Sequence, residues 1–105
     1  MNSFKSTVFS ALGDPSRLRI LEYLRTGEKC VSEIVRVVGF AQPTVSMHLK
    51  VLLDCGILKC RKDGNKMFYS IAFAKIYDLI DLVDSNLVRS LSRNVIGRMQ
   101  RGYQK

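Results

Sequence analysis

The chain has 105 residues, of which 47% are hydrophobic and 25% are charged, the composition of one ordinary globular domain. Seventeen Lys and Arg against nine Asp and Glu give a formal net charge of +8, so nucleic acid is the first partner to consider. No window approaches the roughly 18 apolar residues of a membrane span, and no signal-peptide run is present, so we expect a cytoplasmic protein without a membrane partner. Three cysteines without framework spacing favour a reducing compartment over a disulfide scaffold.

Apolar residues at helical spacing predict four helices in the first half of the chain. Asp14-Pro15 opens the second helix, because Asp accepts a free N–H at the N-cap and Pro suits the first helical position. Gly39 ends the third helix, and Pro43 begins the fourth. The predicted helices cover residues 4–12, 15–26, 32–38 and 43–55, with an extended stretch over 28–31.

The third and fourth helices are joined by a turn of about four residues, which is typical of a helix-turn-helix. Two β-prone runs, residues 57–62 and 66–71, lie on either side of Asp63-Gly64, a dipeptide that suits a tight hairpin. This hairpin is the wing. The pattern therefore predicts a mainly α fold with a β-hairpin wing, a winged helix-turn-helix that forms a single domain over residues 1–105.

A final helix is predicted from about Phe73, and its apolar stripe is too long for a small core to cover. We therefore expect a dimer through the first and last helices. The side chains assigned to this interface are Phe4, Val8, Ile76, Leu79, Ile80, Val83 and Leu87. The basic tail, about residues 93–105, is expected to be a partly ordered, solvated end.

The fourth helix has one apolar face, and its opposite face is free to point outward. Recognition helices read base edges with their N-terminal residues. Gln42 suits adenine, Thr44 or Met47 suits a thymine methyl group, and Lys50 suits a phosphate. The full predicted DNA-binding set is Gln42, Pro43, Thr44, Ser46, Met47, His48 and Lys50 on the helix, with Arg61, Lys62 and Lys66 on the wing. A merely solvated helix face is the alternative.

His48 is the one histidine and lies at the border of the apolar face. Two roles are open for this side chain. It could contact a phosphate, or it could be a hydrogen-bonded residue that positions the helix against the wing.

Two segments resemble the ArsR/SmtB family of winged-helix repressors: DPSRLRIL over residues 14–21 and QPTVSMHLK over residues 42–50. Residues 64–70, GNKMFYS, look like the wing of that family, and the resemblance spans about Phe4 to Leu91. It implies a homodimeric, sequence-specific repressor that binds double-stranded operator DNA and is released from it when an effector binds.

Relatives in this family sense metals through a Cys-Val-Cys-Asp pattern at the start of the third helix, where this chain reads CVSE over residues 30–33. Cys55 resembles one ligand of the cadmium/lead-sensing branch, although Val51 replaces its companion. If Cys30, Cys55 and Cys60 converged, their thiolates would suit a soft effector ion such as As(III), Cd(II), Pb(II) or Hg(II). The alternatives are thiol oxidation, a repressor without an effector, and cysteines that are small buried hydrophobic residues.

Two other functional classes are an enzyme and a non-specific nucleic-acid-binding protein. An enzyme is not expected, because one His, scattered carboxylates and unpaired cysteines offer no nucleophile and base pair. A non-specific architectural nucleic-acid-binding protein remains an alternative, and a steep salt dependence without a preferred duplex would favour it.

Overall fold

The computed structural model describes residues 2–100, and the chain divides between Ala74 and Lys75 into two compact units. Each unit is described in turn. That residues 1–105 form a single domain remains a prediction. Of the predicted tail, residues 93–100 are helical, and residues 101–105 lie outside the described residues.

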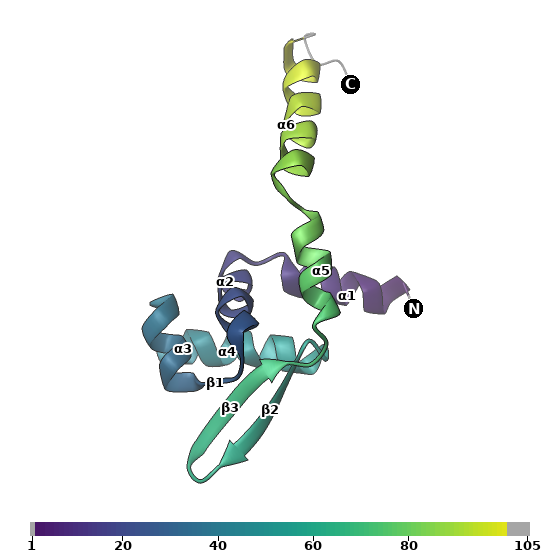
Figure 1. Ribbon diagram of the computed structural model, residues 1–105. Helices are drawn as coiled ribbons and strands as arrows, with labels where there is room; N and C mark the ends of the chain where they lie inside the picture. Colours follow the sequence, from purple (N-terminus) through teal and green to yellow (C-terminus); the bar gives the residue numbers. More distant parts are fainter. Residues whose placement is uncertain (1, 101–105) are drawn as a thin grey trace. The chain divides into compact units, whose positions relative to one another are not determined.

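The first unit contains four α-helices and a small sheet (Figure 1). Its elements in chain order are α1 (Asn2–Leu12), α2 (Pro15–Tyr23), a short 3₁₀ turn (Leu24–Thr26), β1 (Lys29–Cys30), α3 (Val31–Val38), α4 (Gln42–Asp54), β2 (Leu58–Asp63) and β3 (Lys66–Ile71). The three strands form an antiparallel sheet in the order β1-β3-β2. The predicted mainly helical winged helix-turn-helix is confirmed, and the extended stretch before α3 is found to be a third strand of the wing sheet.

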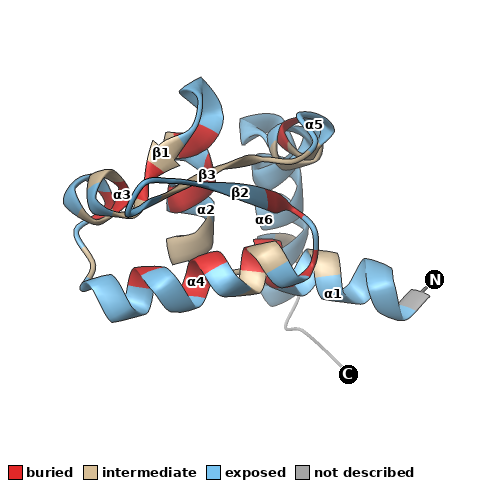
Figure 2. Ribbon diagram, turned by 90° about the horizontal axis from the view of Figure 1, so that it is seen from below, coloured by how far each residue is buried: buried red, intermediate tan, exposed pale blue. Residues whose placement is uncertain are grey.

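The core of this unit is formed by α2, α3 and α4. Its fully buried side chains are Ile20, Leu21, Leu24, Ile34, Val45, Leu49 and Leu52. Buried and exposed residues alternate along α4 (Figure 2), because the helix turns by about 100° per residue and only one of its faces reaches the core. The predicted apolar face of α4 is therefore the buried one.

The wing turn differs by one residue from the prediction. Asp63 pairs with Lys66 across β2 and β3, so the two turn residues are Gly64 and Asn65 rather than Asp63 and Gly64. Gly64 has φ of 63°, whereas no described non-glycine residue has a positive φ. Glycine at the first central position is the arrangement of a type II′ hairpin turn, which keeps the natural twist of the strands.

The second unit consists of α5 (Lys75–Leu82) and α6 (Ser85–Gln100). The single last helix predicted from about Phe73 is therefore wrong, since the helix is interrupted at Val83 and Asp84. The Asp84 carboxylate accepts a hydrogen bond from the Leu87 amide at 2.9 Å, as an N-cap residue does, and so begins a new helix. Among residues 2–100, no helix is long and apolar enough to cross a membrane.

The start of α2 is fixed by Asp14, as the sequence predicts. Its Oδ1 accepts hydrogen bonds from the Ser16 amide at 2.8 Å and from the Arg17 amide at 3.1 Å, and Pro15 occupies the first turn. These backbone hydrogen bonds, chiefly the one from Arg17, lower the pKa of the Asp14 carboxyl from 3.8. The charged carboxylate is thus stabilised by folding.

We expect Asp14→Asn to make the free energy of unfolding less dependent on pH in acid. Because the folded-state pKa of Asp14 is lowered, its contribution is present above pH 3.8 and is lost as the pH falls through the folded-state pKa. Asn keeps the capping oxygen without titrating, so proton uptake on unfolding should fall by roughly one proton at most. Urea unfolding between about pH 2.5 and 7 measures this.

Asp14→Ala serves as the control, because it removes the cap itself and should lower stability throughout that pH range. Identical pH profiles for the wild type and Asp14→Asn would show that Asp14 does not contribute to acid unfolding.

Candidate nucleic-acid interface

The outward face of α4 carries the residues that were predicted to read DNA. Val45, Leu49 and Leu52 hold the other face in the core. The exposed residues are Gln42, Pro43, Thr44, Ser46, Met47 and Lys50. Lys50 pairs with Asp54 at 3.1 Å, and because both side chains are largely exposed, this ion pair contributes little and leaves the ammonium available.

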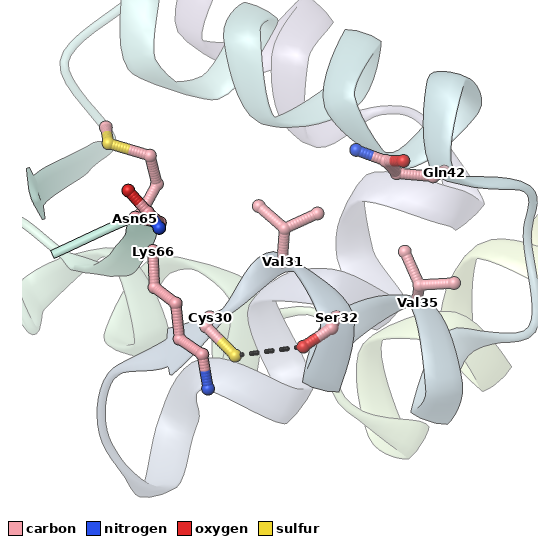
Figure 3. A pocket seen from close by; sticks show the side chains of 8 residues that line it. Cys30, Val31, Ser32, Val35, Gln42, Asn65 and Lys66 are labelled. Carbon is pink, nitrogen blue, oxygen red and sulfur yellow. Dashed lines mark hydrogen bonds between the residues drawn. The ribbon is translucent and has the colours of Figure 1, made fainter. Parts of the chain in front are cut away.

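The beginning of α4 and the tip of the wing share one hollow of about 480 Å³ (Figure 3). Gln42 of α4 and Lys66 of the wing both line this hollow. Two residues that were predicted to bind DNA from separate elements therefore border the same space. The remaining lining residues are Cys30, Val31, Ser32, Val35, Asn65 and Met67. A group bound in this hollow would touch both DNA-reading elements at once.

The three predicted wing cations differ in their surroundings. Lys62 and Lys66 are exposed and have no ion-pair partner among the described residues. The guanidinium of Arg61, in contrast, donates through Nε to both carboxylate oxygens of Glu28 at 3.0 Å and lies 4.8 Å from the centre of the Phe68 ring. Hydrogen bonding to Arg61 lowers the pKa of Glu28, and the same contact raises the pKa of Arg61. The positive charge of Arg61 is therefore partly compensated.

His48 lies inside the protein, with a side chain that is only 6% exposed. Its Nδ1 is 3.2 Å from a terminal nitrogen of Arg17 on α2. This is the geometry of the positioning role weighed above. The partner lies on α2, however, and not on the wing, and Arg17 was not singled out from the sequence. A DNA contact by His48 remains a prediction that its burial does not favour.

The predicted convergence of the three cysteines is wrong within one protomer. Cys30 pairs with Phe68 across β1 and β3, whereas Cys60 pairs with Tyr69 across β2 and β3. Since successive residues of a strand point to opposite faces, the thiols of Cys30 and Cys60 lie on opposite sides of the sheet.

The third thiol, Cys55, donates to the Val51 carbonyl at 3.3 Å in the last turn of α4. Cys30 and Cys55 are buried, and Cys60 is exposed. No cluster of three or more His, Cys, Asp or Glu side chains within residues 2–100 is placed to share a metal ion.

The residues assigned to a dimer interface leave apolar surface uncovered in the single chain. Phe4 is 57%, Val83 60% and Leu87 40% exposed, whereas Val8, Ile76, Leu79 and Ile80 are half-buried. Beyond the assigned interface residues, α6 also exposes Val88, Leu91, Val95, Ile96 and Met99. The interface itself remains a prediction.

A winged helix-turn-helix with an outward recognition face and free wing lysines defines a DNA-binding transcriptional regulator. The family model described as "Bacterial regulatory protein, arsR family" matches residues 14–59. The "Arsenical resistance operon repressor" of Staphylococcus aureus is 38% identical over 93 residues, 86% of this chain and 89% of that protein. The chain belongs to the ArsR family, and it is a DNA-binding transcriptional repressor and not an enzyme.

Two further relatives are a mercury resistance repressor and a homodimeric domain. The "Probable mercury resistance operon repressor" of Streptomyces lividans is 43% identical over 74 residues, which are 70% of this chain and 59% of the length of that protein. The solution structure of a homodimeric winged helix-turn-helix domain from Mycobacterium bovis, described as a possible ArsR-family regulator, superimposes with a TM-score of 0.74. It is 30% identical, and the match covers 87% of this chain and 84% of that domain.

We expect Glu28→Gln to tighten DNA binding, because it removes the main ion pair of Arg61 and leaves a longer one with Asp63 at 3.7 Å, so that the guanidinium can reach a phosphate. Binding to any duplex should become about threefold tighter at low salt, and the slope of log affinity against log salt should steepen by about 1. Fluorescence anisotropy over a range of salt concentrations measures both quantities.

Glu22→Gln is the matched control, because Glu22 forms a comparable exposed ion pair with Arg25 at 2.8 Å and lies on α2, outside the wing. Equal affinities for the two variants would indicate that the release of Arg61 adds no DNA contact.

Proposed function

We propose that this repressor binds a pseudo-palindromic operator as a homodimer, with the beginning of α4 in the major groove and the wing on the adjacent backbone. The outward, unpaired face formed by Gln42, Thr44 and Met47 is the observation that carries this proposal. These residues occupy the first two turns of α4, the part of a recognition helix that reaches base edges. Lys62 and Lys66 are free to neutralise phosphates beside it.

Homodimerisation is supported by the exposed apolar side chains of α1 and α6 and by the homodimeric relative from M. bovis. Apolar side chains that a small chain leaves exposed are stabilised when a second copy covers them. A two-fold symmetric dimer presents two copies of α4 and therefore reads two half-sites in opposite orientation, about one helical turn of DNA apart or a multiple of it.

The experiment that tests this function compares two duplexes, one from the promoter upstream of the protein's own gene and one scrambled with the same composition. We expect the wild type to prefer the promoter duplex. Gln42→Ala should weaken promoter binding by about 1–3 kcal/mol and leave the scrambled duplex nearly unaffected, because it removes a base contact. Lys66→Ala should weaken both duplexes alike and reduce the salt slope by about 1, because it removes a phosphate contact.

Equal affinity of the wild type for the two duplexes would contradict a sequence-specific repressor and favour the architectural alternative. Sedimentation of the free protein is measured in parallel, and a monomer at the concentrations that saturate the operator would contradict the homodimer.

We further propose that a thiophilic ion is the effector and that Cys30 is the thiol through which it acts. The names of the mercury and arsenical resistance repressors support this class of effector. Cys30 lines the hollow that Gln42 and Lys66 also line, so an ion bound to its thiolate would share that hollow with residues of both α4 and the wing. Cys55 and Cys60 have no such position.

We expect As(III) or Hg(II) to release the repressor from its promoter duplex, and Cys30→Ser to abolish that release while operator affinity is retained. Fluorescence anisotropy measures this release from DNA. Each ion, including Cd(II) and Pb(II), is titrated under controlled thiol conditions. Cys60→Ser, which changes an exposed thiol on the other face of the sheet, is the control and should respond as the wild type does. Release that survives in Cys30→Ser would contradict the role of this thiol.

A further inference from the structure

Arg17 occupies the point where three helices of the first unit meet. It belongs to the first turn of α2, and its backbone amide donates to the Asp14 cap. Its guanidinium reaches two other elements. Nε donates to the Ala11 carbonyl at 2.7 Å, one terminal nitrogen lies 3.4 Å from the Ser10 carbonyl, and the other lies 3.2 Å from His48 Nδ1.

The contact with α1 satisfies the end of that helix. Ala11 and Ser10 lie in its last turn, where backbone carbonyls lack donors within the helix, and the Ser10 carbonyl also accepts the Gly13 amide at 3.2 Å. A cation at this position also interacts favourably with the negative end of the helix dipole. Arg17 therefore holds the C-terminal end of α1 by both hydrogen bonds and charge.

The contact with α4 fixes the recognition helix through a buried side chain. A guanidinium only donates hydrogen bonds, so in this contact Nδ1 of His48 is the acceptor. His48 directly follows Met47 and lies one helical turn after Thr44. A rotation or shift of α4 that breaks the Arg17 contact therefore displaces these two outward side chains by a comparable distance.

Direct packing between α1 and α4 is incomplete. A hollow of about 460 Å³ lies between them, and Arg17 forms part of its wall together with Ser10 and Ala11 of α1 and Val51 of α4. The polar bridge from the α1 carbonyls through Arg17 to His48 therefore links the two helices where packed side chains do not fill the space.

We propose that Arg17 and His48 are positioning residues that couple α1, a helix of the dimer interface, to the DNA-reading surface of α4. The inference rests on the proposed operator-binding homodimer. In a dimer, the partner holds α1, and the Arg17 bridge transfers that placement to α4. Removal of the bridge leaves the base-reading residues present but misplaced, so operator affinity falls while non-specific attraction to phosphates is retained.

The test uses the full chain, the promoter and scrambled duplexes, and thermal unfolding. His48→Leu removes the acceptor while keeping an apolar buried group, and His48→Asn keeps an acceptor close to the position of Nδ1. We expect His48→Leu to weaken promoter binding about tenfold with less than about a twofold change for the scrambled duplex. His48→Asn should recover most of the loss. A merely structural role would instead lower the unfolding midpoint and affect both duplexes equally.

A double-mutant cycle then tests the bridge itself. Arg17→Lys keeps the charge but not the planar fork, and Arg25→Lys on the exposed 3₁₀ turn is its matched control. We expect Arg17→Lys to weaken promoter binding, and the added His48→Leu change to cost little more, because both break one bridge. Additive losses, or a His48→Leu variant that keeps the wild-type preference for the promoter duplex, would overturn the inference. A wild type without that preference would contradict the proposed function instead.

Discussion

The burial of one face of α4 is the constraint on which the arrangement of the candidate nucleic-acid interface depends. Val45, Leu49 and Leu52 are at most 1% exposed, and they pack where α2, α3 and α4 meet. Because side chains are fixed at about 100° intervals around a helix, burying these three determines the direction in which Gln42, Thr44 and Met47 point. The apolar core thereby orients the exposed surface of the helix.

Local signals in the sequence were sufficient to predict the helices of the first unit and the outward face of α4. Asp14-Pro15 begins α2, Gly39 ends α3, and Gly64 adopts the positive φ of the wing turn. Each of these signals acts through the backbone within a few residues, so it can be read without knowledge of distant contacts. The same reasoning missed the interruption before α6, because a single Asp at the start of a helix is a weak signal inside a long apolar pattern.

The partners of the site residues could not be predicted, because they lie far away in sequence. Arg61 meets Glu28 across 33 residues, and His48 meets Arg17 across 31. Periodicity assigns a residue to a face of its own element but does not identify what packs against that face. The predicted convergence of the three cysteines was wrong for a related reason. Only the register of β3 with β1 and β2 shows that Cys30 and Cys60 lie on opposite sides of the sheet.

The surroundings of each cation, rather than the total charge, determine which side chains of the wing are available to bind a phosphate. The net charge of +8 counts Arg61, Lys62 and Lys66 equally. Arg61 is paired with Glu28 and lies over the Phe68 ring, so it is less available to a phosphate than the two lysines. Lys66 is free, and it lies at the hollow that Gln42 also lines. Lys66, which is predicted to bind a phosphate, and Gln42, which is predicted to bind a base edge, therefore line the same hollow.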